Sequence, residues 1–364
     1  MAKILIVSVS AGSGHVRAAN AIEAYLENQG HTIKHVDLMD YSKKWFKNIY
    51  ADKYIDLINN HPKVWKLLFD ITDKPTKKSV YKTRRWFEYK LHKKFFDMLG
   101  DFQPEHIIST HFMPPEILVR FKEKYLVDFQ IYVAVTDFDV HQLWVHPEVD
   151  HFFVAGNLAK NKLLENNIHP HDITISGIPI SPQFFKQFNK EELLKKYNLS
   201  NNKKTLLLMA GGAGVGNLDI VSEEILNNFN DIQIIALPGK NNQLLDKLLS
   251  LKQVYGDRLN SLGFTNEVHE LMYLADLVVT KPGGLSTSEC ISLKKPMLLI
   301  NPIPGQEEFN AHNIESLGLG KLSSNIIADV KYMMENLETY QNSFNNIQTY
   351  DTQNIYQQFF KDII

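Results

Sequence analysis

Residues 281–312 read KPGGLSTSECISLKKPMLLINPIPGQEEFNAH, and this stretch decides how the C-terminal part of the chain is expected to fold. An apolar strand (277–280) leads into a glycine turn, after which small hydroxylated residues open a helix. A second apolar strand (296–300) and a polar loop, PIPGQEEFN, come next. A glycine turn that feeds a helix N-terminus presents backbone N–H groups and the positive end of the helix dipole, so this turn favours a bound phosphate.

Carboxylate and amide side chains follow this predicted phosphate site. Glu289 lies one turn into the helix, where a carboxylate can accept hydrogen bonds from ribose hydroxyls, as acids do at dinucleotide sites. Gln306, Glu307 and Asn310 lie in the next loop and suit the hydroxyls of a hexose. The order of phosphate, ribose and hexose ligands predicts a nucleotide-sugar site. A glycine pair before a helix could by itself also be a plain tight turn.

The string IPGQE…N resembles the donor-site signature of GT-B glycosyltransferases, in particular the family of monogalactosyldiacylglycerol synthases and diacylglycerol glucosyltransferases. It is similar, more distantly, to the N-acetylglucosaminyltransferase that makes lipid II. The resemblance spans most of the chain and is strongest over 12–20 and 263–310. It implies an α/β protein of the GT-B class, with two doubly wound Rossmann-like domains that face a cleft. It also implies a hexosyltransferase that uses a UDP-sugar and inverts the anomeric carbon.

The resemblance assigns donor contacts to particular positions. It places the uracil at Phe264 and Thr265, the diphosphate at 284–286, the ribose at Glu289 and the sugar at Gln306 and Glu307. Two glycine loops, GSGH (12–15) and GGAGVGN (211–217), carry backbone N–H groups that can reach the diphosphate or the sugar. The predicted donor-binding residues are therefore Gly12, Gly14, Gly212, Phe264, Thr265, Gly284, Leu285, Ser286, Glu289, Gln306, Glu307 and Asn310.

The KPGGLST turn departs from the plant-type galactosyl enzymes, in which the glycine turn is ordered differently. This departure leaves the choice between UDP-glucose and UDP-galactose open, while the diphosphate assignment stands.

Composition and length point to a two-domain globular protein. The chain has 364 residues, a length that is more than one hydrophobic core usually holds. Hydrophobic residues make up 44% of the chain and charged residues 22%, as in ordinary globular proteins. Its one cysteine, Cys290, excludes a disulfide framework and fits a reducing compartment. No stretch reaches the roughly 20 apolar residues of a membrane span. The first residues read as a strand and turn rather than a signal peptide, so we expect a cytoplasmic location. We also expect the enzyme to need no cofactor.

Two series of alternating strands and helices set the predicted domains. The first series begins with the apolar strand 3–9, and the proline- and glycine-rich stretch GIPISPQF (177–184) ends it. The predicted domains are an N-terminal acceptor and membrane-binding domain (1–180), a C-terminal UDP-sugar domain (181–330) and a helical tail (331–364). The tail is expected to pack on the N-terminal domain.

A basic, aromatic insertion (42–97) interrupts the first series. Between Lys43 and Lys94 there are 15 Lys/Arg and five acids, a net charge of +10 in a chain whose total is −2. Basic residues attract a surface to anionic lipid, and aromatic side chains settle at the headgroup level. The same mixture could bind nucleic acid, or it could form ordinary amphipathic helices with aromatic cores. We favour contact with an anionic membrane surface and expect no nucleic-acid partner.

His15, which follows the first predicted strand at the start of a helix, is the candidate catalytic base. Ligands of doubly wound sheets bind outside the carboxyl ends of the strands, so the loop that carries His15 should face the ligand. Attack by an alcohol on an anomeric carbon needs a proton acceptor, and imidazole titrates in the suitable range. The resemblance covers this position as well, because the family carries a glycine-rich loop that ends in His. The alternative is that His15 binds a phosphate or caps the helix.

Two further loops at predicted strand ends supply candidate residues. TDFDVHQLWVHP (136–147) gathers acids and histidines that invite a metal interpretation, but no recognised metal-binding spacing accompanies them. We therefore expect no metal, with Asp137 orienting the base or the acceptor hydroxyl and Trp144 lining an acceptor pocket. In STHFMPP (109–115), His111 is a second candidate for the acceptor site, with helix capping as its alternative role.

The sequence thus favours an inverting enzyme that moves glucose or galactose from a UDP-sugar to diacylglycerol at the inner face of the cell membrane. Three alternatives remain: a transferase that acts on a polyprenyl-linked or small acceptor, an epimerase of UDP-N-acetylglucosamine, and a non-catalytic UDP-sugar sensor. The pair His15 and Asp137 argues against the sensor, which needs no base.

Overall fold

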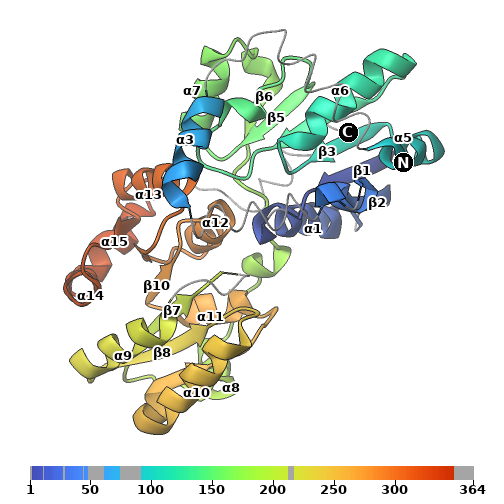
Figure 1. Cartoon of the computed structure of the whole chain (residues 1–364). Coiled ribbons are helices and arrows are strands. Elements are labelled where there is room, and N and C mark those ends of the chain that lie inside the picture. The colour runs from blue at the N-terminus through green and yellow to red at the C-terminus, as the bar shows by residue number, and fades with distance from the viewer. Residues whose placement is uncertain are drawn as a thin grey trace. The chain divides into compact units, whose positions relative to one another are not determined.

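The computed structural model of the chain describes residues 2–10, 12–27, 29–43, 45–47, 61–73, 92–211 and 217–347 (Figure 1). Most of the predicted insertion 42–97, the predicted donor residue Gly212 and the last part of the predicted tail lie outside these ranges. The chain divides into two units. Of the described residues, those up to Pro182 and Ile303–Phe309 belong to unit 1, and Gln183–Pro302 and 310–347 belong to unit 2.

Unit 1 is built on a six-stranded parallel sheet with the order β2-β1-β3-β4-β5-β6. Its strands are β1 (Lys3–Ser8), β2 (Thr32–Asp37), β3 (His106–Ser109), β4 (Gln130–Ala134), β5 (His151–Val154) and β6 (Ile173–Ile175). Its helices are α1 (Ser13–Glu27), α3 (Pro62–Thr72), α5 (Lys93–Phe102), α6 (Met113–Tyr125) and α7 (Asn157–Glu165).

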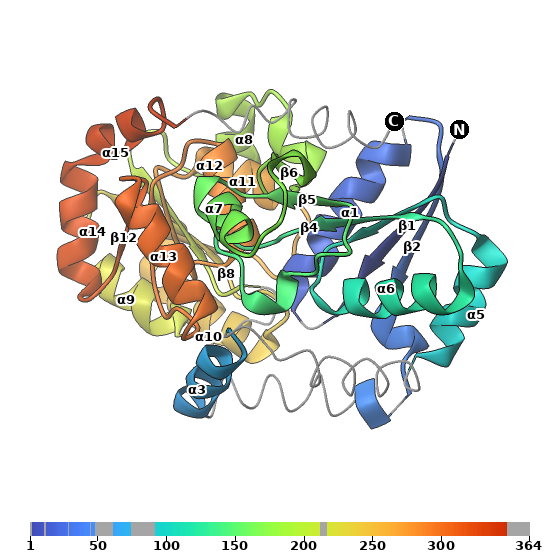
Figure 2. The same cartoon turned by 90° about the horizontal axis from the view of Figure 1, so that it is seen from above.

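Helices cover both faces of this sheet because its strands are apolar on both sides, as expected for a parallel sheet. Five of the six β1 residues are buried. One face packs against Phe95 of α5, Ile117 of α6 and Leu163 of α7 in a single core. Figure 2 shows α5 and α6 on one side of the sheet and α1 on the other. Ile22 and Leu26 of α1 are fully buried.

Unit 2 repeats the plan with the strand order β12-β11-β10-β7-β8-β9, again all parallel. Its strands are β7 (Lys204–Met209), β8 (Ile232–Leu237), β9 (Leu259–Ser261), β10 (Leu277–Thr280), β11 (Met297–Leu299) and β12 (Gly320–Leu322). Its helices are α8 (Lys190–Lys196), α9 (Leu218–Asn228), α10 (Asn242–Tyr255), α11 (Val268–Leu274), α12 (Gly284–Ser292), α14 (Ile326–Glu335) and α15 (Leu337–Ser343), together with most of α13 (Gln306–Ser316).

The strands predicted at 3–9, 277–280 and 296–300 are present as β1, β10 and β11, with ends that differ by at most one residue. The sequence did not predict β12. It is three residues long, and Gly320 fits there because a Cβ at this position would lie 2.4 Å from the Met297 carbonyl oxygen. A strand of only three residues, with a glycine where two backbones lie close together, gives little alternation of polar and apolar residues in the sequence. No helix in the described part of the chain is long and apolar enough to cross a membrane.

Candidate functional site

Three neighbouring strands of unit 1 end at the candidate site. β1, β3 and β4 are adjacent in the sheet, and His15, His111 and Asp137 lie in the segments that follow them. The chain runs outward in opposite directions from β1 and β3, so the switch point of this sheet lies between these two strands. Open α/β sheets bind their ligands outside the carboxyl ends of the strands at such a point. The topology therefore places His15 and His111 where a ligand is expected.

The imidazole of His15 is held in one orientation. Its Nδ1 lies 2.8 Å from the Thr110 carbonyl oxygen and 2.9 Å from Thr136 Oγ1. A carbonyl oxygen can only accept, so Nδ1 carries the hydrogen of the neutral ring and Nε2 carries the lone pair. The Thr110 hydroxyl in turn donates to the His15 carbonyl oxygen at 2.9 Å. The two segments therefore brace each other and leave Nε2 as the basic atom.

Burial keeps the histidines of this site neutral. It lowers the pKa of His15 to about 4, although the hydrogen bond to Thr110 acts in the opposite direction. Burial, and then the neighbouring His15, hold the pKa of His111 well below its usual range. The two ring centroids are 4.6 Å apart in an edge-to-face arrangement. At neutral pH both rings are uncharged, so His15 is in the form that can accept a proton.

A pocket of about 310 Å³ in unit 1 opens onto this pair of histidines. Most of its wall is aromatic or aliphatic, with a smaller number of polar groups that include His15, which is typical of a site for a largely apolar ligand. The lining residues are His15, Trp65, Leu68, Phe69, Thr72, His111, Phe112, Asp137, Asp139, His141, Leu143, Trp144, Gln306 and Phe309.

The segment Ile303–Phe309 forms part of this pocket because a glycine lets it approach α3 closely. Gly305 has a φ of +86°, and a Cβ there would lie 2.8 Å from the Phe69 ring. Trp65 Nε1 donates to the Pro304 carbonyl oxygen at 3.1 Å, and Lys66 Nζ lies 2.7 Å from Glu308 Oε2. The glycine of the PGQE string is thus required both by its backbone conformation and by the aromatic ring packed against it.

The structure brings five predicted residues together in this pocket: His15, His111, Asp137, Trp144 and Gln306. Trp144 is buried, with its ring centroid 6.3 Å from that of His15. The Nδ1 of His111 accepts a hydrogen bond from the Met113 N–H at the start of α6, and His111 also lines the pocket. Its contact with the acceptor stays a prediction. Gln306, predicted as a sugar ligand, lines the same pocket.

The predicted phosphate site lies at the corresponding point of the second sheet. The switch point of unit 2 falls between β7 and β10, and α12 begins at Gly284 directly after the turn that follows β10. No side chain caps this helix, whose N-cap is Gly283. Ser286 in the first turn is partly exposed, whereas Leu285 is buried. A helix start of this kind can bind a diphosphate through its N–H groups.

Two other predicted donor residues of unit 2 are buried. Glu289 on α12 is 1% exposed and Asn310 is fully buried. The Asn310 side chain donates from Nδ2 to the Pro282 carbonyl oxygen at 3.0 Å, so it braces the turn that precedes α12. Their contacts with ribose and sugar stay predictions.

The polar loop predicted at PIPGQEEFN is wrong in part, because α13 begins at Gln306 and includes Glu307 and Asn310. Carboxylates of its first turn cap the helix: Glu307 accepts from the Ile303 N–H at 2.7 Å and Glu308 from the Gly305 N–H at 3.0 Å. Acids in the first turn after a Pro-Gly pair are a signal for a helix start that the sequence interpretation overlooked.

The remaining predicted donor residues lie in segments at strand ends. Phe264 is exposed, and Lys240 Nζ lies 5.3 Å from its ring centroid. The hydroxyl of Thr265 accepts from the Glu267 N–H at 3.0 Å. Gly12 has a φ of +133°, and Gly14 lies in the first turn of α1.

Several residues of the site were not assigned from the sequence. Thr110 and Thr136 hold the His15 ring, and Trp65, Leu68 and Phe69 of α3 line the pocket. The spacing of these α3 side chains is that of one helix face, but no sequence signal pairs them with a loop more than 200 residues away. Within the described residues, no group of three or more His, Cys, Asp or Glu side chains could hold a metal ion.

Two family models match the two halves of the chain. A model described as monogalactosyldiacylglycerol (MGDG) synthase matches residues 15–180, and one described as glycosyltransferase family 28 C-terminal domain matches residues 206–364. A processive diacylglycerol beta-glucosyltransferase of Bacillus pumilus is 31% identical over all of this chain and 94% of its own length. The Bacillus subtilis protein of the same name is 32% identical over 87% of this chain and 82% of its own.

Solved structures share the two-sheet architecture. UDP-GlcNAc 2-epimerase from Neisseria meningitidis, bound to UDP-GlcNAc, superimposes with a TM-score of 0.63 over 99% of both chains at 15% identity. MurG from Acinetobacter baumannii gives a TM-score of 0.59 over 99% of both chains at 12% identity. These likenesses establish the predicted GT-B fold. With its two family domains and its full-length relatives, the chain belongs to the family of diacylglycerol glycosyltransferases that join an MGDG synthase domain to a glycosyltransferase family 28 C-terminal domain.

Proposed function

We propose that this enzyme transfers glucose from UDP-glucose to the free hydroxyl of diacylglycerol, with inversion at the anomeric carbon. The observation that carries the proposal is the neutral His15, whose Nδ1–H is fixed on the Thr110 carbonyl oxygen at an apolar-walled pocket. The relatives are named as beta-glucosyltransferases of diacylglycerol, which favours glucose over galactose. UDP-GlcNAc and UDP are named as the ligands of two proteins with this fold, which favours UDP as the nucleotide.

The proposed reaction is a single displacement. The acceptor hydroxyl forms a bond to the anomeric carbon while the bond from that carbon to the diphosphate oxygen breaks, and the diphosphate keeps the electron pair. The hydroxyl proton passes to His15 Nε2, and the hydroxyl becomes more acidic as the new bond forms. Asp137, which lines the same pocket, would offset the charge of the imidazolium. The N–H groups at the start of α12 would stabilise the departing diphosphate.

The pH dependence of kcat/KM should reveal the buried base. A histidine base is active above its pKa, and burial lowers the pKa of His15 from 6.5 to about 4. We therefore expect activity to stay level from pH 8 to about 5 and to fall only as the pH approaches about 4. The measurement is initial rates at low substrate concentration across this range, with circular dichroism to verify folding. A fall in activity with a midpoint near the ordinary histidine value of about 6.5 would contradict the assignment.

We also propose that the enzyme acts while docked on an anionic membrane surface, at the inner face of the cell membrane. In the described part of the predicted insertion, Val64, Leu67 and Ile71 form an apolar stripe along α3 and are 50%, 59% and 55% exposed. Basic side chains accompany this stripe, since Lys63 and Lys66 lie on the same helix. A helix with exposed apolar and basic residues is typical of a membrane interface.

Replacing Val64, Leu67 and Ile71 by serine is expected to weaken binding to anionic vesicles roughly 30-fold. At roughly 25 cal/mol per Å² of apolar surface, three half-exposed side chains contribute about 2 kcal/mol. Sedimentation with vesicles measures the affinity. The matched control places serine at Ile220, Leu249 and Val254, exposed aliphatic residues of α9 and α10 in unit 2. If both variants lose vesicle binding equally, α3 is not part of the surface that docks on the membrane.

The proposed function is tested by incubating the full chain with anionic vesicles that contain diacylglycerol and with labelled UDP-glucose, UDP-galactose or UDP-GlcNAc in parallel reactions. We expect label in the lipid from UDP-glucose. Label from UDP-galactose alone would show that the sugar is wrong while the reaction class stands. Conversion of UDP-GlcNAc into its C2 epimer without lipid labelling would favour the reaction for which the similar solved structure is named.

A further inference from the structure

Helix α3 supplies one wall of the pocket that contains His15 but is weakly held by apolar packing. Trp65, Leu68, Phe69 and Thr72 line the pocket. None of the α3 side chains whose exposure the structure describes is buried, whereas α5 of the same unit buries Phe95 and three other apolar residues. Since burial of apolar area is the main source of fixed packing, the position of α3 depends on its polar anchors.

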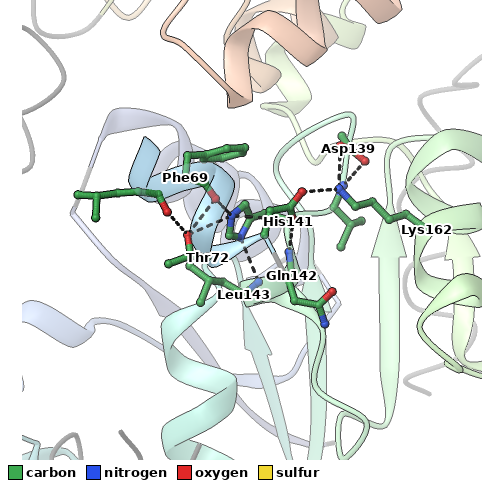
Figure 3. A network of polar contacts seen from close by, with 10 residues as sticks. Phe69, Thr72, Asp139, His141, Gln142, Leu143 and Lys162 are labelled. Carbon is green, nitrogen blue, oxygen red and sulfur yellow. Dashed lines mark hydrogen bonds and ion pairs between the residues drawn. The ribbon is translucent and has the colours of Figure 1, made fainter. Parts of the chain in front are cut away.

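The main anchor is a cluster at the C-terminal end of α3 (Figure 3). Asp73, the C-cap residue, accepts a hydrogen bond from the Gln142 N–H at 2.8 Å through Oδ1. Its Oδ2 lies 3.2 Å from Lys162 Nζ, and the same ammonium group lies 3.1 Å from Asp139 Oδ2. The lysine, which extends from α7, is therefore shared by two carboxylates from different segments. Their side chains are 25% exposed or less, so solvent screens these pairs only partly.

His141 completes the anchor with a fixed tautomer. Its Nδ1 accepts from the Leu143 N–H at 3.1 Å, so Nε2 carries the hydrogen and donates to the Phe69 carbonyl oxygen at 3.1 Å. The Phe69 and His141 ring centroids are 4.4 Å apart. In Figure 3 the His141 ring and the Lys162 ammonium group both point toward the end of α3. The Phe69 carbonyl group in the last turn of α3 and the side chain of its C-cap residue Asp73 are thus held by one cluster.

We propose that Lys162 is a positioning residue that fixes α3 as the pocket wall and thereby sets the affinity for the lipid acceptor. This inference rests on the proposed function, in which the pocket receives diacylglycerol. Lys162 itself does not line the pocket. It acts through Asp73 and Asp139: without its charge the two carboxylates face each other, and α3 moves away from Trp144 and Phe309, which line the same pocket. A mobile pocket wall lowers the affinity for the acceptor, while the reacting groups near His15 stay in place.

Replacing Lys162 by methionine tests this role because the aliphatic stem is kept and the charge is removed. We expect the KM for diacylglycerol to rise roughly tenfold, with kcat and the KM for UDP-glucose within threefold of the original values. Lys162→Arg should restore most of the acceptor affinity. Asp73→Lys combined with Lys162→Asp should restore part of it, because the swap returns one cation between two acids. The matched control is Lys160→Met on the same helix, at a position outside the anchor.

A second measurement separates this proposal from the proposed function. Hydrogen exchange of a peptide that covers 61–73 in the full chain reports the anchoring of α3 without any substrate. We expect Lys162→Met to accelerate exchange there at least fivefold and to leave peptides from β1 and β3 unchanged. Unchanged exchange, or a KM for diacylglycerol equal to that of the control, would overturn the role of Lys162. If Lys162→Met accelerates exchange but the original protein transfers no sugar to lipid, the proposed function is overturned. Lys162 would then still anchor α3, but the pocket would not be a site for the lipid acceptor.

Discussion

Replacing His15 by alanine is expected to lower kcat by about 10²–10⁴-fold, the range in which a positioned general base contributes. The reason is that Nδ1 is committed to the Thr110 carbonyl oxygen and the Thr136 hydroxyl, so that Nε2 is the proposed proton acceptor. UDP-glucose affinity should change less than threefold, because the predicted diphosphate ligands belong to α12 in the other unit. Steady-state kinetics and UDP titration calorimetry measure the two effects separately.

The matched control for this variant is His171→Ala. The side chain of His171 is 78% exposed and lies away from the pocket-lining residues. This substitution removes an imidazole from the same unit and leaves the pocket beside His15 unchanged. If His15→Ala keeps kcat within a few-fold of the original value, another group takes the hydroxyl proton.

Glu289→Gln is the second variant for which we expect a large effect, an increase of about 10–100-fold in the KM for UDP-glucose. Hydrogen bonds to a charged group contribute about 1.5–3 kcal/mol, and the amide keeps the shape but loses the charge. Glu289 is 1% exposed on α12, the helix that begins at the switch point of the second sheet. kcat at saturating donor should fall much less than kcat/KM, because a ribose contact is made in both the ground state and the transition state.

Two measurements guard against a purely structural explanation for Glu289. The melting temperature shows whether the buried substitution disturbs the fold, and calorimetry with UDP reports donor binding in the absence of any acceptor. Glu335→Gln, on the exposed surface of α14 in the same unit, is the control. An unchanged UDP affinity in Glu289→Gln would show that the ribose is bound elsewhere.

The sheets could be predicted from the sequence because their strands are short continuous apolar runs, and a parallel sheet buries both faces of such runs. β10 coincides with its predicted range, 277–280. β12 could not be predicted in the same way, since its pairing with β11 depends on the close backbone approach at Gly320 rather than on periodicity. The acids that follow Gly305 indicate the start of α13, but the prolines that precede it favour a loop.

The candidate site could be predicted only where it follows directly from strand ends. His15, His111 and Asp137 were assigned because loops at the carboxyl ends of parallel strands converge. The sequence could not order the strands, so it did not show that His15 and His111 lie at the switch point between β1 and β3. The wall from α3 depends on contacts such as Trp65 with Pro304, which only the folded chain reveals. The tautomer of His15 depends on a backbone carbonyl group, which carries no sequence signal at all.

A single-turnover reaction distinguishes transfer of glucose to diacylglycerol from other fates of UDP-glucose. Enzyme in excess over labelled UDP-glucose is mixed with anionic vesicles that contain diacylglycerol, and lipid-bound label and free UDP are followed in the same samples. We expect that one glucose enters the lipid for each UDP released, in a β-linkage, and that His15→Ala abolishes both on this time scale. UDP release without label in the lipid, or UDP binding with neither product, would contradict the assignment of diacylglycerol to the pocket beside His15.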